Sequence, residues 1–444
     1  MSKPVCLVTA PVATRSGYGA HSRDIVRSLI KLDRYDIKIW SVRWGNTPMN
    51  ALDKDDSNDK MIIDRLLTSP ELPAQPEIHI HIVIPVEFQP FAKYNIGITA
   101  GLETTACPPQ WIQGMNKMDL NIVPATFVKD VLNKVQFDIQ DDKTGEKQGI
   151  LKNEKPLEVL FEGADTNIYK QTNEFTQEFV DEMGKIDEEF CFLYVGHWLQ
   201  GRIGQDRKDT GMMVKVFCET FKNMKNQPAL IMKTSSASFS VIDRENMLIK
   251  IDEIKSQVKG KCPNVYLVHG DFTDEEMNGL YNHPKVKAHV SFTHGEGFGR
   301  PLLEASLSGK PVIAPNWSGP ADFLDSKYSV LLDGNLTKVQ PGSFPKEFFV
   351  EGSDWFTVNY QKASQTFRKV YRSYKKYTAN AKRLANQNSK KFSLDAMTVE
   401  LGKILDKYVS DFPQQVSLQL PKLKKVGSDT SEPTKIKLPK LKKV

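Results

Sequence analysis

A short stretch in the second half of the chain, HGEGFGRPLLE, combines three glycines with two carboxylates. Glu296 and Glu304 are separated by seven residues, and Gly295, Gly297 and Gly299 alternate at its start. Glycine lets a ligand approach the backbone closely, a helix start favours a phosphate, and carboxylates accept hydrogen bonds from hydroxyl groups. Phosphate and hydroxyl groups occur together in sugar nucleotides, so the stretch predicts a site for such a ligand.

The neighbouring segments indicate how this stretch is positioned. An apolar strand is expected at 286–292, and Pro301 suits the first turn of a helix that follows it. A second strand is expected at 311–315, followed by a turn that contains Ser318 and Gly319. Both loops then lie at the carboxyl edge of one parallel sheet, which is where open α/β sheets bind ligands.

Two successive series of apolar segments and helices run along the chain, which predicts an α/β protein. Two such series favour two doubly wound, Rossmann-like domains that face a central cleft. The first series has expected strands at 5–10, 35–42, 78–85, 95–101 and 120–125, with helices at 108–117 and 126–134. The second has expected strands at 190–196, 228–234, 264–270, 286–292 and 311–315, and the stretch 356–409 is expected to be helical.

The expected domain limits follow from these series. Residues 1–170 form the first domain and residues 171–390 the second, and the last helix, 391–409, returns to the first. A polar insertion occupies 138–155. Residues 410–444 read as a disordered basic tail, because Pro421 and Pro439 prevent a helix and the linker between them is polar.

The tail repeats one pattern, LPKLKKV, at 420–426 and again at 438–444. Residues 411–444 hold eight lysines against three acidic residues, whereas the other 410 residues are nearly neutral, with 52 basic and 51 acidic side chains. The repeat is expected to dock a protein partner or an anionic surface. A nearly neutral body argues against a protein that coats nucleic acid.

The composition indicates the class of protein and its cellular environment. Of the 444 residues, 40% are hydrophobic and 26% charged, which is typical of a globular protein. No apolar run is long enough to predict a transmembrane segment. The five cysteines are scattered and form no CxxC pair, which favours a reduced, cytoplasmic setting over a disulfide framework or a zinc site.

The motif EGFGRPLLE…GKPVIA…SG resembles the signature of retaining GT-B glycosyltransferases of group 1, which include glycogen synthases and bacterial mannosyltransferases. Further segments are similar to that family in the same order: SGYGAHSRDIV, GLETTACPPQW, FEGADTNIY, GRIGQDRKDTG and FTDEEMNGLY. The resemblance covers roughly residues 5–409 and implies transfer of a sugar from a nucleoside-diphosphate sugar to an acceptor.

The resemblance also implies roles for individual residues. Glu304 would hold the ribose of the donor, and Glu296 would contact its sugar. The other implied donor-binding positions are Gly297, Phe298, Gly299, Arg300, Ser318 and Gly319 around the glutamate loop, and Gly17, Tyr18 and Gly19 after the first strand. The segment after Glu103 lacks the histidine that many family members place near the sugar, so that role stays open.

Cations are required to stabilise the leaving diphosphate. Lys208 matches the family lysine, and Arg207 beside it is the favoured arginine. Arg202, six residues before Lys208, is the alternative, because the loop is longer than usual and His197 stands where the arginine often lies. We therefore expect Glu296, Lys208 and Arg207 at the reacting centre.

No cofactor and no metal are implied by the resemblance. A DKD segment at 53–55 matches a metal-binding motif of another glycosyltransferase fold, but no strand leads into it. Two other functions remain open, namely glycosyl transfer to modified DNA bases and non-catalytic binding of a sugar nucleotide. The donor, the acceptor and the oligomeric state are not determined by the sequence.

Overall fold

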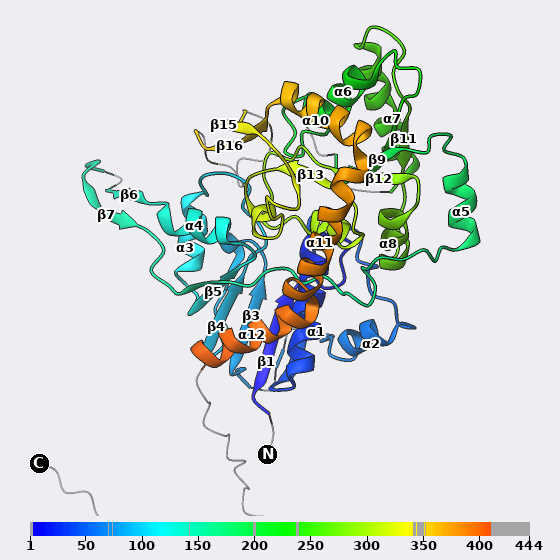
Figure 1. Cartoon of the computed structure of the whole chain (residues 1–444). Helices are drawn as coiled ribbons and strands as arrows, with labels where there is room; N and C mark the ends of the chain where they lie inside the picture. The colour runs from blue at the N-terminus through cyan, green and yellow to red at the C-terminus, as the bar shows by residue number, and fades with distance from the viewer. Residues whose placement is uncertain are drawn as a thin grey trace, which may run out of the picture. The chain divides into compact units, whose positions relative to one another are not determined.

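The fold contains two parallel six-stranded sheets, each covered by helices (Figure 1). The structure, a computed structural model, describes residues 3–69, 71–72, 74–141, 143–198, 201–236, 239–340, 343, 350 and 352–409. Among these residues, no helix is both long and apolar enough to cross a membrane.

The first sheet has the strand order β2-β1-β3-β4-β5-β8, and all its strands are parallel. The strands are β1 (Val5–Ala10), β2 (Asp36–Ser41), β3 (Ile78–Ile82), β4 (Tyr94–Ile98), β5 (Leu120–Val123) and β8 (Leu157–Val159). Its helical segments are α1 (Gly17–Leu32), α2 (Ser57–Ile63), η1 (Pro85–Glu87), α3 (Pro109–Met115) and α4 (Thr126–Lys134). The near-continuous apolar sequences of the strands suit a sheet that is buried on both faces.

The second sheet repeats this arrangement with the order β11-β10-β9-β12-β13-β14. Its strands are β9 (Cys191–Val195), β10 (Ala229–Lys233), β11 (Val265–Val268), β12 (Val286–Val290), β13 (Val312–Pro315) and β14 (Val330–Leu332). Its helical segments are α5 (Gln177–Gly184), α6 (Thr210–Phe221), α7 (Val241–Ser256), α8 (Asp274–Asn282), α9 (Arg300–Leu307) and η2 (Gly319–Asp322). The prediction of two doubly wound, Rossmann-like halves is confirmed.

In both sheets the first strand lies inside the sheet, so the strand order reverses beside it. β1 pairs with β2 and β3, and β9 pairs with β10 and β12. Ligands of doubly wound sheets bind at the carboxyl ends of the strands next to such a reversal. The loops that begin after β1 and β9 are therefore the expected binding loops of each half.

The last helices of the described part of the chain are α10 (Tyr360–Arg372), α11 (Tyr374–Lys391) and α12 (Leu394–Tyr408). α12 packs on α1 of the first half, where Thr398 Oγ1 donates to Ser28 Oγ at 2.8 Å. A parallel bridge between Ala164 and Ser393 fixes the entry to α12. The last helix thus covers a helix from the start of the chain.

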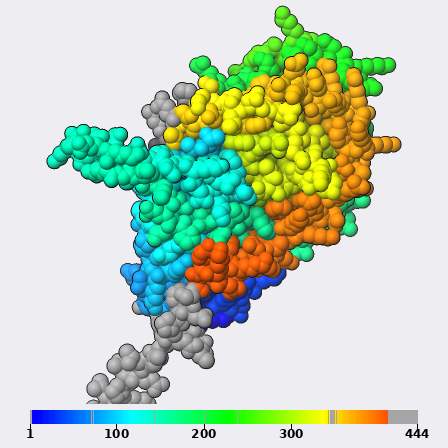
Figure 2. Space-filling model, turned by 60° about the vertical axis from the view of Figure 1, so that its left-hand side comes forward, coloured from blue at the N-terminus to red at the C-terminus, as the bar shows by residue number. Residues whose placement is uncertain are grey.

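Two expectations about secondary structure were incomplete. Helix was expected from residue 356, but β16 (Asp354–Val358) pairs with β15 (Gly334–Lys338), and the helix begins at Tyr360. The sequence DWFTV is aromatic and β-branched, which favours a strand. The polar insertion is a hairpin of β6 (Phe137–Gln140) and β7 (Lys147–Leu151) that extends away from the sheet (Figures 1 and 2).

The repeated LPKLKKV segments of the predicted tail lie outside the described residues.

Candidate functional site

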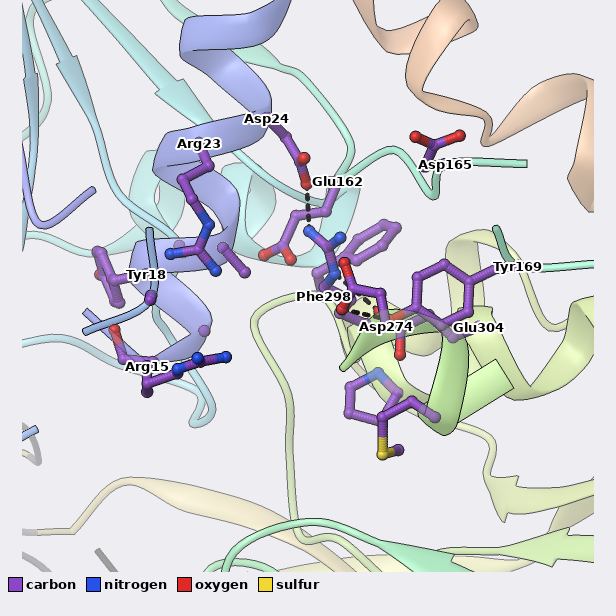
Figure 3. Close-up of a pocket in the computed structure, with 18 of the residues that line it drawn as sticks. Arg15, Tyr18, Arg23, Asp24, Glu162, Asp165, Tyr169, Asp274, Phe298 and Glu304 are labelled. Carbon is purple, nitrogen blue, oxygen red and sulfur yellow. Dashed lines mark hydrogen bonds and ion pairs between the residues drawn. The ribbon is translucent and has the colours of Figure 1, made fainter. Parts of the chain in front are cut away.

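A cavity of about 1190 Å³ lies between the carboxyl edges of the two sheets (Figure 3). Its lining from the first half includes the loop after β1, the start of α1 and the segment after β4. From the second half, it includes the loops after β9, β10, β11 and β12. A cavity of this size that is walled by two sheets is large enough for a sugar nucleotide.

Glu296 is the centre of a buried charge cluster in this cavity. Lys208 Nζ lies 2.5 Å from Glu296 Oε1, and Arg207 Nη1 lies 3.2 Å from Glu296 Oε2. Arg207 Nη1 also donates to the carbonyl oxygen of Gly295 at 2.9 Å and lies 3.5 Å from Glu103 Oε1. The structure therefore brings together the three residues expected at the reacting centre.

The charge states of this cluster follow from burial and pairing. Burial alone would raise the pKa of Glu296, but the charges of Lys208 and Arg207 outweigh it and lower that pKa to about 2. Burial lowers the pKa of Lys208, which Glu296 partly offsets. Glu103 has a raised pKa because of burial and the nearby charge of Glu296. Within this cluster, the cationic partners Lys208 and Arg207 keep Glu296 firmly ionised.

The loop that carries Arg207 and Lys208 is held in place by a hydrogen bond to the glutamate loop, residues 294–299. The backbone N–H of His294 donates to the carbonyl oxygen of Arg207 at 2.8 Å. Asp209, which precedes α6, adopts a left-handed conformation with φ of 49° and accepts from Tyr360 OH at 2.8 Å. Arg202 is exposed and does not line the cavity, so its position differs from that of Arg207.

Gly295 and Gly297 serve a packing role that the sequence did not reveal. A Cβ on Gly297 would lie 2.0 Å from the carbonyl oxygen of Ala100, and one on Gly295 would lie 2.2 Å from that of Glu103. We expected these glycines to let a ligand approach the backbone. Both glycines also pack tightly against the segment after β4, so they allow the two halves of the molecule to meet, and Gly297 in addition lines the cavity.

Gly297→Ala is expected to destabilise the protein, because its Cβ would clash with backbone that cannot easily move. We expect a loss of about 1–3 kcal/mol in the free energy of unfolding, measured by urea denaturation. Gly184→Ala is the matched control, since a Cβ there would meet nothing within 4 Å. Equal stability of the two variants would contradict the packing role.

The remaining residues of the glutamate loop support its shape. Gly299 has φ of 97° and precedes α9, whose first turn contains Pro301. Ser318 Oγ accepts from the backbone N–H of Glu296 at 3.0 Å, and a Cβ on Gly319 would lie 2.3 Å from the carbonyl oxygen of Gly297. Ser318 and Gly319 therefore stabilise the loop that carries Glu296 by packing against it, and they do not line the cavity.

Glu304 forms a second charge cluster on α9. Arg300 Nε donates to its Oε1 at 2.8 Å, and Tyr281 OH donates to its Oε2 at 3.2 Å. Arg300 also pairs with Asp24 of α1, so this cluster joins the two halves (Figure 3). Burial raises the pKa of Glu304 to about 7, although Arg300 opposes that rise.

The first turn of α1 contributes one aromatic side chain to the cavity. Tyr18 stacks on Trp44 with ring centroids 3.9 Å apart, and its OH lies 2.8 Å from Thr99 Oγ1. Gly17 lines the cavity, whereas Gly19 does not. A Cβ on Gly19 would lie 2.2 Å from the carbonyl oxygen of Thr14, so Gly19 permits a tight turn.

Further charged residues line the cavity and were not singled out from the sequence. Among them are Arg23, Asp24, Glu162 and Lys233. Lys233, at the end of β10, donates to the carbonyl oxygen of Gly270 at 2.6 Å, and burial lowers its pKa to about 8. Its position at a carboxyl strand end was the available signal, since such ends meet at the ligand edge.

Two Rossmann-like halves that face one cleft define the GT-B fold, and the solved structures that match the chain include GT-B glycosyltransferases. Sucrose-phosphate synthase from Thermosynechococcus elongatus matches with a TM-score of 0.60 and 12% identity over 91% of this chain and 98% of that one. HepE from Anabaena, solved with UDP-glucose, matches with a TM-score of 0.57 and 11% identity over 91% and 100%.

A glycosyltransferase from Rickettsia africae matches with a TM-score of 0.55 and 14% identity over 93% of this chain and 100% of that one. No protein-family model and no curated protein sequence matches the chain. The resemblance inferred from the motifs is thus confirmed at the level of the fold.

Proposed function

We propose that this protein is a retaining glycosyltransferase that moves a sugar from a nucleoside-diphosphate sugar to a hydroxyl group of an acceptor. The observation that carries the proposal is the cavity between the sheets, in which Arg207 and Lys208 converge on Glu296. The similarity of the fold to HepE, which was solved with UDP-glucose, supports a nucleotide-sugar donor.

In this proposal the donor lies on the second half of the molecule. Glu304 accepts hydrogen bonds from the ribose hydroxyls, and the start of α9 faces the diphosphate. Lys208 and Arg207 neutralise the diphosphate, and the position of Arg207 favours it over Arg202. Glu296 orients Lys208 and contacts the donor sugar.

The reaction then breaks the bond between the anomeric carbon and the diphosphate oxygen and forms a bond to the acceptor oxygen. The acceptor attacks from the face that the diphosphate leaves, and its proton passes to the departing diphosphate. Lys208 and Arg207 act because negative charge grows on the leaving group in the transition state. This route requires no pair of catalytic carboxylates of the glycosidase type.

A panel of nucleoside-diphosphate sugars tests the proposal. The full-length protein is incubated with each donor, and release of the nucleoside diphosphate is scored by mass spectrometry. We expect release from one donor or a few related donors, and the anomeric configuration of the product is read by NMR. Absence of binding and of turnover with every donor would contradict glycosyl transfer.

Turnover is expected to be independent of divalent metal ions. Lys208 and Arg207 supply two positive charges beside the proposed diphosphate position, which is the task that a metal performs in other transferases. We therefore expect EDTA to leave the rate of donor turnover largely intact. Loss of activity with EDTA and its recovery with manganese would overturn this prediction.

We also propose that the repeated LPKLKKV segments dock a protein partner or an anionic surface. Truncation after Tyr408 is expected to leave turnover with a small soluble acceptor nearly unchanged and to weaken co-sedimentation with phosphatidylserine vesicles. Neutral vesicles are the control for charge. Loss of donor turnover in the truncated protein would show instead that the tail belongs to the catalytic unit.

A further inference from the structure

Five arginines line the cavity, and four of them are already paired with carboxylates. Arg207 and Arg300 pair within the clusters described above. Arg15 lies 3.2 Å from Asp271, and Arg27 lies 2.8 Å from Asp59. Arg23, the fifth, has no ion pair within the described part of the chain.

Arg23 is held with part of its guanidinium group directed into the cavity. It lies on α1, and its Nη1 donates to the carbonyl oxygens of Val12 and Thr14, both at 3.0 Å. Figure 3 shows the guanidinium group pointing into the open space beside Glu162. Its Nε and Nη2 form no hydrogen bond with the residues that the structure describes, and burial lowers its pKa. The charges of Asp24 and Asp59 oppose this lowering without forming an ion pair with Arg23. A largely buried cation without a direct ion pair is costly, so an anionic ligand that contacts it would stabilise it.

Glu162 faces the same space from the segment after β8. Its backbone is fixed because Gly163 N–H contacts Met397 Sδ at 3.2 Å and Ala164 bridges to Ser393. The residue is only 7% exposed, yet its carboxyl group forms no hydrogen bond with the described residues. Burial, reinforced by the charges of Asp24 and Glu304, raises its pKa to about 8. A carboxyl group that keeps its proton can both donate to and accept from a hydroxyl group.

We propose that Arg23 and Glu162 form the acceptor subsite, and that the acceptor is a sugar or polyol that carries a phosphate or a carboxylate. Arg23 binds the anionic group, since a guanidinium fork matches the geometry of either anion. Glu162 binds hydroxyl groups of the same molecule. Both residues belong to the half opposite Arg207 and Lys208, so the acceptor faces the donor across the cavity. This inference rests on the proposed glycosyl transfer.

Binding of three matched probes to the full-length protein tests the inference. Glucose 6-phosphate, glucuronate and glucose differ only in their anionic group, and calorimetry measures the affinity for each. We expect one or both anionic probes to bind about tenfold or more tightly than glucose, and the phosphate and carboxylate arms identify the preferred anion. Equal affinities for all three probes would overturn the inference.

Variants then assign the preference to the two residues. Arg23→Met should abolish the preference for the anionic probe, and Arg23→Lys should retain part of it. Glu162→Leu should lower the affinity for all three probes and retain the preference for the anionic probe. Arg34→Met is the matched control, because Arg34 follows the end of α1, pairs with Asp406 at 2.6 Å and does not line the cavity. This variant should bind the probes as the wild type does. Thermal unfolding confirms that each variant is folded.

Nucleoside diphosphate affinity separates this inference from the proposed function. Arg23→Met should leave that affinity within about twofold, because the cations proposed for the diphosphate lie on the other half. An equal loss of nucleotide and anionic-probe affinity would place Arg23 in the donor site and overturn the inference. A wild-type protein that binds the anionic probe through Arg23 but binds no nucleotide would support the anion site and overturn glycosyl transfer.

Discussion

Lys208→Ala should lower kcat by roughly 100- to 1000-fold, which is the usual cost of removing one preorganised charge from a developing anion. The substitution removes a buried ammonium group that lies 2.5 Å from Glu296, in the cavity proposed to hold the diphosphate. Ground-state binding should suffer less, because the charge on the leaving group grows in the transition state. Single-turnover kinetics with saturating donor measures the effect.

The matched variant for this experiment is Arg202→Met. Arg202 is exposed and outside the cavity lining, so we expect kcat to change little. A decrease in kcat as large as that of Lys208→Ala would indicate that Arg202 binds the diphosphate, which is the alternative that the sequence left open. Unchanged kcat in Lys208→Ala would remove Lys208 from the reacting centre.

Glu304→Ala should raise the dissociation constant of the donor by an amount equivalent to about 1.5–3 kcal/mol. In the proposed site the ionised carboxylate would form charge-assisted hydrogen bonds with ribose hydroxyls, which are stronger than bonds to a neutral group. Calorimetric titration with the nucleoside diphosphate measures the change. Glu253→Gln, an exposed position on α7, is the control, and wild-type affinity in the Glu304 variant would contradict the role.

The same residue predicts a pH dependence. The pKa of Glu304 is raised to about 7, so the carboxyl group is mostly protonated below that pH and ionised above it. Donor affinity should therefore increase as the pH rises through 7 in the wild type. Glu304→Gln should lack this increase, and an identical pH profile in both proteins would assign the titration to another group.

Much of the fold could be predicted because its strands are short apolar runs in a regular α/β order. The helix α9 was recognised from Pro301, which lies in its first turn. β16 was missed because the helical sequence that begins at Tyr360 follows it closely, and the expected helix was therefore started too early, at residue 356. The hairpin β6–β7 was missed because its strands are short and largely exposed: FDIQ alternates over only four residues, and KQGIL does not alternate.

The part of the candidate site formed by residues close in sequence, such as Glu296 and Glu304, could be predicted from the sequence. Arg207 and Lys208 could be paired with Glu296 only through the family resemblance, since 88 residues separate Lys208 from Glu296. The choice between Arg207 and Arg202 depends on the path of a loop fixed by Asp209. Arg23 was not predicted, because its spacing on α1 resembles the exposed face of an ordinary helix.

The position of α12 on α1 has a consequence for synthesis of the protein. α1 leaves the ribosome early, but its partner helix is formed by residues 394–408. A nascent chain that has extended only to residue 170 therefore has its first sheet without the helix that covers α1. Contacts such as those of Arg34 with Asp406, at 2.6 Å, form only after residue 406 has left the ribosome. Expression of the first 170 residues alone should accordingly yield a fragment that requires α12 in trans, and a circular permutant that begins with α12 should fold this half early.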